Sequence, residues 1–135
     1  MTARQPSDGS GLVLAAAAAS VAKKADDILI LDVSKQLVIT DYFLICSGST
    51  DRQVRTIASE VERQLLKDHG VKPSHREGER ESRWVVLDYI DFVVHVFHAE
   101  DRDYYRLERL WSDAPVLPFD PSVEERNESA ATKAT

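Results

Sequence analysis

The chain has 135 residues, of which 43% are hydrophobic and 30% charged, with a formal net charge of −6. This length predicts one domain with a single sizeable core, and the composition is ordinary for a globular protein. Both halves of the chain are acidic, so we expect no basic patch and no non-specific binding to nucleic acid or an anionic membrane. The charge is compatible with a basic protein partner.

Cysteine usage bears on the cellular compartment. Cys46 is the only cysteine, so no intramolecular disulfide can form, and a cytoplasmic location is expected. The apolar run over 12–19 is short, dominated by alanine and not preceded by a basic cluster. A signal peptide or a membrane span has a different pattern.

The chain divides into a mobile N-terminus over 1–11, a compact domain over 12–119 and a disordered C-terminal tail over 120–135, as judged from composition and periodicity. A first helix is predicted over 12–25, where five alanines follow one another and Lys23 and Lys24 occupy the last turn. Unbroken apolar runs predict buried strands. These strands are expected over 28–31 and 42–46, with a short strand or an extended connection over 37–39.

The longest predicted helix begins after Thr50. Thr50 and Gln53 match a capping box, in which the two side chains satisfy free backbone N–H groups. The apolar residues that follow fall on one side of a helix. They are Val54, Ile57, Ala58, Val61 and Leu65. Gly70 and Pro73 end the helix, and a charged surface loop is predicted over 72–83.

The most strongly patterned stretch, 84–98, predicts a β-hairpin. With Asp88 and Asp91 facing each other across the turn, Leu87 opposes Phe92, and side chains alternate between two faces. The apolar face, expected to lie in the core, holds Val85, Leu87, Phe92, Val94 and Val96. The other face, expected to be exposed, holds Trp84, Val86, Asp88, Asp91, Val93, His95 and Phe97.

A last helix is predicted over 100–111, followed by an extended exit containing three prolines. The order of elements is helix, two strands, long helix, two strands, helix. This order predicts an α/β fold in a single compact domain, with a mixed β-sheet packed against helices.

Two arrangements are candidates for catalysis. Ser47, Gly48 and Ser49 precede a helix N-terminus, which can hold a phosphate, but no closely spaced carboxylates follow to bind a divalent metal. A glycine turn before a capped helix is therefore favoured. Asp88 and Asp91 can bring two carboxylates together, yet aspartate is common in turns because it bonds the local backbone.

Metal and cofactor sites are not expected. His95 and His98 are three residues apart on a strand and point to opposite faces, so they cannot bind one ion together. His69 and His75 have no cysteine or acid pair at a zinc-like spacing. Cys46 ends an apolar strand and has no neighbouring base, so we assign it to the core.

The second hairpin face is either covered by a helix as ordinary core or open as a docking surface. Trp84, His95 and Phe97 are compatible with both. The acids Asp88 and Asp91 on the same face slightly favour docking, because buried charges need partners. An apolar centre with an acidic rim suits a basic protein.

Several blocks of the chain, in a single order, resemble the ribosomal silencing factor family, also called Iojap. They are ADDILILDVS (25–34), ITDYFLICSGS (39–49), RQV (52–54), EG (77–78), WVVLDY (84–89), DFVVHVFH (91–98) and YRLERLW (105–111). The resemblance implies a nucleotidyltransferase-like fold without the catalytic carboxylates, and a translational repressor that is not an enzyme. It further implies binding to ribosomal protein fourteen of the large subunit, which blocks small-subunit joining, especially under nutrient limitation. Free members of the family are often homodimers.

On this resemblance and the face pattern, a set of partner-binding residues is expected, with Trp84 as the apolar anchor. The set is Trp84, Val86, Asp88, Tyr89, Asp91, His95, Phe97 and Glu100. The family usually has glycine where this chain has Ile90, so a different or strained turn is expected beside Asp91. The alternatives are a small nucleotidyltransferase-like enzyme using Ser49 and the hairpin aspartates, and a plain dimerisation module.

Overall fold

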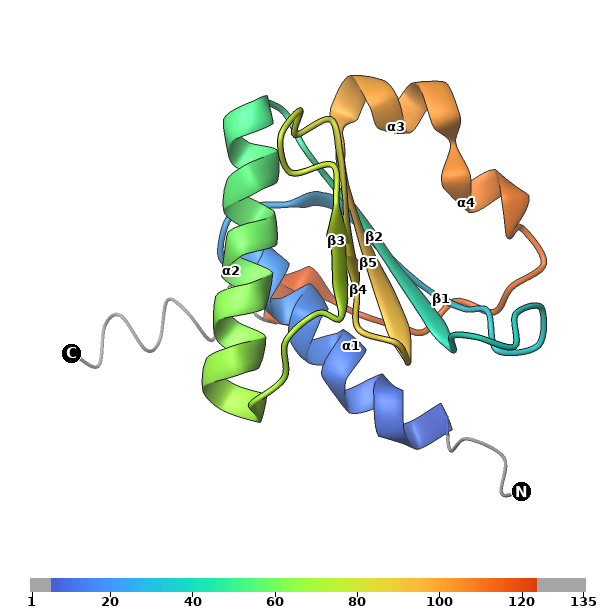
Figure 1. The fold of residues 1–135 in the computed structure, drawn as a ribbon. Helices are drawn as coiled ribbons and strands as arrows, with labels where there is room; N and C mark the ends of the chain where they lie inside the picture. Colours follow the sequence, from blue (N-terminus) through green and yellow to red (C-terminus); the bar gives the residue numbers. More distant parts are fainter. Residues whose placement is uncertain (1–5, 124–135) are drawn as a thin grey trace.

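A computed structural model describes residues 6–123, which form a sheet with helices on both faces (Figure 1). The helices are α1 (Pro6–Val21), α2 (Asp51–His69), α3 (Ala99–Tyr105) and α4 (Leu107–Leu110). The strands are β1 (Asp26–Asp32), β2 (Tyr42–Gly48), β3 (His75–Glu77), β4 (Trp84–Asp88) and β5 (Phe92–His98). Of the tail predicted over 120–135, residues 124–135 lie outside the described residues.

The five strands lie in the order β1-β2-β5-β4-β3. β2 and β5 are parallel and the other neighbouring pairs are antiparallel, so the predicted mixed sheet is confirmed. Helices α1 and α2 cover one face, and α3 and α4 cover the other (Figure 1). Two apolar cores result, one on each side of the sheet.

The ends of α1 differ from the prediction. The helix begins at Pro6, so the expected mobile N-terminus is wrong for residues 6–11. Proline is compatible with a first helical turn because the N–H that it lacks has no partner there. The helix ends at Val21, and Lys24 has a φ of 61°, so Lys23 and Lys24 follow the helix instead of occupying its last turn.

Helix α2 starts as predicted but with a different side-chain bond. Thr50 Oγ1 accepts a hydrogen bond from the Gln53 backbone N–H at 3.0 Å, as in a capping box. Gln53 Oε1 accepts from the N–H of Ser49, at 2.7 Å, and not from that of Thr50. The predicted apolar stripe of α2 is confirmed, since each of its five residues is buried against the sheet.

Two segments were predicted incorrectly. The predicted charged loop contains β3, a short edge strand. Its three residues are all charged or polar and exposed, so they lack the alternation of apolar and polar residues by which a strand is predicted. The single helix predicted over 100–111 is two helices, separated at Arg106, where φ is 49°. Residues 37–39 form no strand, and the side chains of Val38 and Ile39 are exposed.

The extended exit forms part of the fold. The backbone N–H of Asp32 donates to the carbonyl oxygen of Pro115, and that of Leu117 donates to Ile30. These bonds continue the sheet beyond the free edge of β1, where unpaired N–H groups would otherwise face solvent. The exit therefore covers an edge strand.

The hairpin register differs from the prediction by two residues. Leu87 pairs with Val94, and Asp88 with Val93. Tyr89 donates its N–H to the carbonyl of Phe92, so Ile90 and Asp91 form the turn. A shift of two preserves the alternation of side chains, so the division into two faces is correct although the pairing is not.

The turn is strained at Ile90. Its φ is 74°, and the N–H of Asp91 donates to the carbonyl of Tyr89 at 2.9 Å, which is the pattern of a tight γ-turn with positive φ. Asp88 Oδ1 accepts from the Ile90 N–H at 2.8 Å, so this aspartate performs the expected turn role. The strain expected at Ile90 is confirmed.

Replacing Ile90 by glycine is expected to stabilise the domain by about 1 kcal/mol. Relief of the left-handed strain, about 1–2 kcal/mol, outweighs the extra entropy that glycine loses on folding. The side chain is 59% exposed, so little packing is lost. Urea unfolding measures the difference, with Ile90→Ala as the control that keeps the strain. Equal stability of the glycine and alanine variants would show that the turn is unstrained.

Candidate functional site

The hairpin face on the side of α3 and α4 is the candidate site. Trp84 stacks on Phe97, with ring centroids 4.7 Å apart, and lies 5.2 Å from the ring of Tyr105 in α3. Trp84 is half-buried, whereas Phe97 has no exposed surface and His95 is 7% exposed. The expectation that this whole face is exposed is therefore wrong, because α3 and α4 cover part of it as a second core.

His95 lies next to Trp84 on the same face of the hairpin and is hydrogen-bonded to its indole ring. Trp84 Nε1 donates a hydrogen bond to His95 Nδ1 at 3.1 Å, so the neutral imidazole carries its proton on Nε2. That nitrogen is buried and has no hydrogen-bond partner among the described residues. Burial lowers the pKa of His95 to about 4, because the charged form would lose its hydration.

His95 should make the domain sensitive to acid. In the unfolded chain the His95 imidazole binds a proton near pH 6.5, and in the folded chain near pH 4. The contribution of neutral His95 to the free energy of unfolding is therefore fully present above pH 6.5 and is lost as the pH falls toward about 4. The full difference is about 3 kcal/mol. Urea unfolding across this range should show the loss in the wild type. In His95→Asn, which keeps an acceptor for Trp84 but does not titrate, the loss should be absent; an unchanged loss would assign it to other groups.

The part of this face that remains accessible is a strip along β4 and β5. Trp84, Val86, Asp88 and Val93 are each partly exposed, and Tyr105 is 51% exposed beside Trp84. We call these five residues the aromatic strip. It combines a large aromatic centre with aliphatic and acidic neighbours, which is a composition typical of protein-binding surfaces.

Acidic side chains lie at both ends of the aromatic strip. Asp88 and Asp91 are at the turn end, and Glu100 is at the other end, where its carboxylate is 3.9 Å from Arg83 Nη2. Glu100 has a side chain that is 78% exposed. The predicted acidic rim is therefore divided between the two ends.

Tyr89 and Phe97 do not present contact surface. Tyr89 lies on the opposite face of the sheet, stacked on Phe92 at 4.8 Å in the core beneath α2, and burial raises the pKa of its hydroxyl. Tyr89 continues the alternation of Leu87, which places it on the core face. Both residues were expected to touch a partner, and their positions give them packing roles instead.

The alternative catalytic site is not assembled. β2 and β5 are parallel, with Gly48 opposite His98, so Ser49 lies just beyond the end of β5 that is remote from the hairpin turn. The two ends of β5 are six residue-to-residue steps apart, which corresponds to about 20 Å. Ser49 also donates both its N–H and its hydroxyl to Gln53 Oε1. Ser49 and the hairpin aspartates therefore cannot act on one substrate.

The residues that the structure describes form neither a metal-binding cluster nor a reactive thiol site. No group of three or more histidine, cysteine, aspartate or glutamate side chains there is placed to hold a metal ion. Cys46 is fully buried, and burial raises the pKa of its thiol to about 12. The thiol is therefore neutral and unreactive at physiological pH, in agreement with its assignment to the core.

No helix among residues 6–123 is long and apolar enough to cross a membrane.

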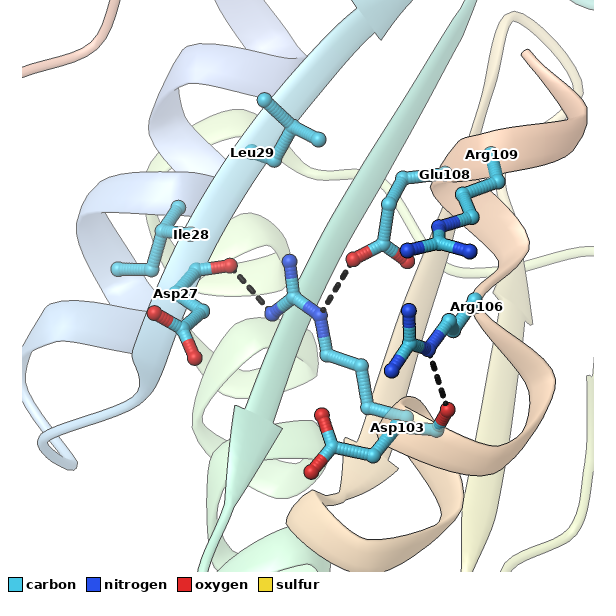
Figure 2. A pocket seen from close by; sticks show the side chains of 8 residues that line it. Asp27, Ile28, Leu29, Asp103, Arg106, Glu108 and Arg109 are labelled. Carbon is cyan, nitrogen blue, oxygen red and sulfur yellow. Dashed lines mark hydrogen bonds and ion pairs between the residues drawn. The ribbon is translucent and has the colours of Figure 1, made fainter. Parts of the chain in front are cut away.

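A hollow of about 500 Å³ lies between β1 and the α3–α4 segment, with Asp27 lining one side and Glu108 and Arg109 lining the other (Figure 2). Arg102, which is buried, crosses it. Its guanidinium donates to the carbonyl of Asp27 and, at 3.2 Å, to Glu108. The pairing of β1 with β2 is irregular between Asp26 and Leu29, and Arg102 ties α4 to this part of β1, which is a structural role. The sequence did not distinguish Arg102 from its exposed neighbours.

The fold and the site define a small α/β domain whose accessible apolar and acidic strip suits contact with another protein. A family model described as "Ribosomal silencing factor during starvation" matches residues 6–135. The chain belongs to the ribosomal silencing factor family.

Individual relatives agree with this assignment. A ribosomal silencing factor of Bacillus subtilis is 49% identical over 105 residues, which cover 78% of this chain and 88% of the relative. The chloroplastic protein Iojap of Zea mays is 33% identical over 112 residues, covering 79% of this chain and 46% of the relative.

Solved structures agree with the fold. A crystal structure from Bacillus halodurans has 37% identity and a TM-score of 0.70, and the match covers 81% of this chain and 98% of that one. A structure from Chromobacterium violaceum has 35% identity and a TM-score of 0.71, with 81% and 88% covered. The predicted α/β fold class with a mixed sheet is confirmed.

Proposed function

We propose that this protein is a translational repressor of the cytoplasm that binds ribosomal protein fourteen of the large subunit. The bound protein would occupy the surface at which the small subunit joins, so that repression follows from steric exclusion without catalysis. Membership of the ribosomal silencing factor family carries this proposal, since the bacterial relatives are named as silencing factors of the ribosome.

The aromatic strip is the proposed contact surface. Trp84 is its apolar anchor, because large aromatic side chains at the centre of an interface commonly supply most of the binding energy. Val86 and Val93 extend the apolar area on the two strands. His95 and Phe97 fix the Trp84 ring from beneath instead of touching the partner.

The acids Asp88, Asp91 and Glu100 are proposed to meet basic side chains of the ribosomal protein. Exposed charges at the edge of an interface mainly raise the association rate and fix the orientation. The separation of these acids along the hairpin would orient the long axis of the strip on a basic partner.

A second copy of the chain is the proposed occupant of the aromatic strip when no ribosome is present. A homodimer of this kind would keep Trp84 out of water in the free protein. Small-angle scattering on the wild type and Trp84→Ala tests this: the wild type should have the mass of a dimer and the variant that of a monomer. If both samples were dimers, the dimer interface would lie outside the aromatic strip.

Co-sedimentation with isolated large subunits tests the function. The protein should sediment with large subunits, and light scattering should show reduced joining when small subunits are added. Adding small subunits first should protect the joined ribosome from the protein. Binding that leaves subunit joining unchanged would contradict steric exclusion, and failure to sediment would contradict ribosome binding altogether.

A further inference from the structure

A cationic hollow lies between the end of α1 and the outer side of α2. It consists of two neighbouring depressions of about 700 and 360 Å³ that share Lys23, Arg52 and Thr56. Its cations are Lys23, Lys24, Arg52, Arg55 and Arg63, all of them exposed. In a chain with a net charge of −6, this is a local concentration of opposite charge, and the expectation that no basic patch exists is wrong.

Tertiary structure creates this cluster from two distant segments. Gln53 Nε2 donates to the carbonyl oxygens of Lys23 and Lys24, at 3.1 Å each, and so holds the end of α1 against the start of α2. The averaged charge of either half of the sequence conceals the arrangement, because acids on other surfaces cancel it. The fold positions the cations without help from a partner.

Most of the cationic charge is not used within the domain. Lys24 and Arg52 make no ion pair with any residue that the structure describes, and Arg55 donates only to the neutral hydroxyl of Ser82 at 3.1 Å. The one acid of the lining, Glu60, is buried and is bonded by Arg63 through two nitrogens, at 3.0 and 2.6 Å. Five cations and one acid leave a local charge of +4.

The chemistry of the lining favours phosphate over a protein partner. No large apolar side chain lines either depression, so the hollow lacks the apolar centre on which protein interfaces depend. Arg52, Arg55 and Arg63 extend about 16 Å along α2, at 1.5 Å per residue. A row of cationic groups of this length matches a series of phosphates. Arg52 and Arg55 can each donate two hydrogen bonds to a phosphate, whereas Arg63 is already bonded to Glu60.

We propose that the cationic hollow binds the phosphate backbone of RNA. The choice of RNA among phosphate polymers rests on the proposed function, which places the protein on the ribosome. The contact would be independent of base sequence, since the lining groups recognise charge. Acidic surfaces elsewhere do not prevent it, because charges further away than about 8 Å are screened at physiological ionic strength.

The hollow and the aromatic strip lie on opposite faces of the sheet, since α2 and α3 do (Figure 1). A protein partner on the strip therefore leaves the hollow accessible. The two contacts can form together or separately, and each can be tested in the absence of the other.

Fluorescence anisotropy with a labelled poly(U) RNA of about 12 nucleotides tests the proposal. Lys23→Glu/Arg52→Glu should lower the affinity at least about tenfold and reduce the slope of log affinity against log salt by about 1.4, corresponding to two lost phosphate contacts. The control is Lys35→Glu/Lys72→Glu, which changes the net charge equally at exposed positions outside the hollow. The control should bind RNA nearly as tightly as the wild type.

Three results would overturn the proposal: no RNA binding by the wild type, equal losses in the two double variants, or equal displacement of the RNA by poly-glutamate. The last result would assign the hollow to an acidic protein. Trp84→Ala should leave the anisotropy unchanged, and Lys23→Glu/Arg52→Glu should still bind isolated ribosomal protein fourteen. Failure of the RNA contact is thereby separated from failure of the proposed function.

Discussion

Replacing Val94 by aspartate is expected to remove most of the stability of the domain. Val94 has no exposed surface and lies in the centre of β5, paired with Leu44 of β2 and Leu87 of β4 in the core beneath α1 and α2. A carboxylate there has no partner, and an unpaired buried charge costs roughly 3–5 kcal/mol. Natural domains of this size are stable by only about 5–15 kcal/mol.

The matched control is Val86→Asp, on the other face of the same hairpin. Val86 is partly exposed, so its carboxylate can stay hydrated, and Glu77 across the strand pair adds only a small repulsion. A loss of about 1 kcal/mol is expected. Urea unfolding followed by tryptophan fluorescence measures both variants. Val94→Asp with wild-type stability, or a greater loss in Val86→Asp, would mean that the two faces are reversed.

These faces could be predicted because alternation survives an error in register. The turn was predicted one residue too early, at Tyr89 and Ile90, whereas Ile90 and Asp91 form it. Isoleucine rarely adopts a positive φ, so the residue type does not show which position of the turn Ile90 occupies. The predicted pairing of Asp88 with Asp91 moved the register by two residues. A shift of one residue would have exchanged the faces and, with them, the entire candidate site.

The covering of the second face could not be predicted for a related reason. The chain bends back over Phe97 and His95 because α3 ends at Arg106 in a left-handed conformation. Arginine has no preference for that conformation, so the pattern suggested one longer helix. The position of this break determines which side chains of the second face are covered, and it leaves Trp84 partly accessible while Phe97 is buried.

Long-range arrangement explains the remaining differences. Sequence spacing left open whether Ser49 and the hairpin aspartates are near one another, and the parallel pairing of β2 with β5 places them at opposite ends of a strand. The same dependence on topology brings Lys23 next to Arg52 in the cationic hollow. The residues were identifiable from the sequence, but their distances depend on the order of strands in the sheet.

Replacing Trp84 by alanine is expected to weaken binding to ribosomal protein fourteen at least about 30-fold. Truncation of a central aromatic anchor commonly costs more than about 2 kcal/mol of binding free energy, which corresponds to that factor. The ring also contributes to the fold, since it stacks on Phe97 and donates to His95. The domain is therefore expected to lose stability in the same variant, and binding has to be measured where it is still folded.

Phe97→Leu separates the two effects. Phe97 is buried directly beneath Trp84, so its truncation weakens the same packing without removing surface that a partner can touch. Calorimetric titration with the purified ribosomal protein should give less than about a threefold loss for Phe97→Leu, against the large loss for Trp84→Ala. Wild-type affinity in Trp84→Ala would exclude Trp84 as the anchor. If the two variants lost the same amount of affinity, binding would depend on intact packing of the core around Phe97 and not on contact with the exposed surface of the indole.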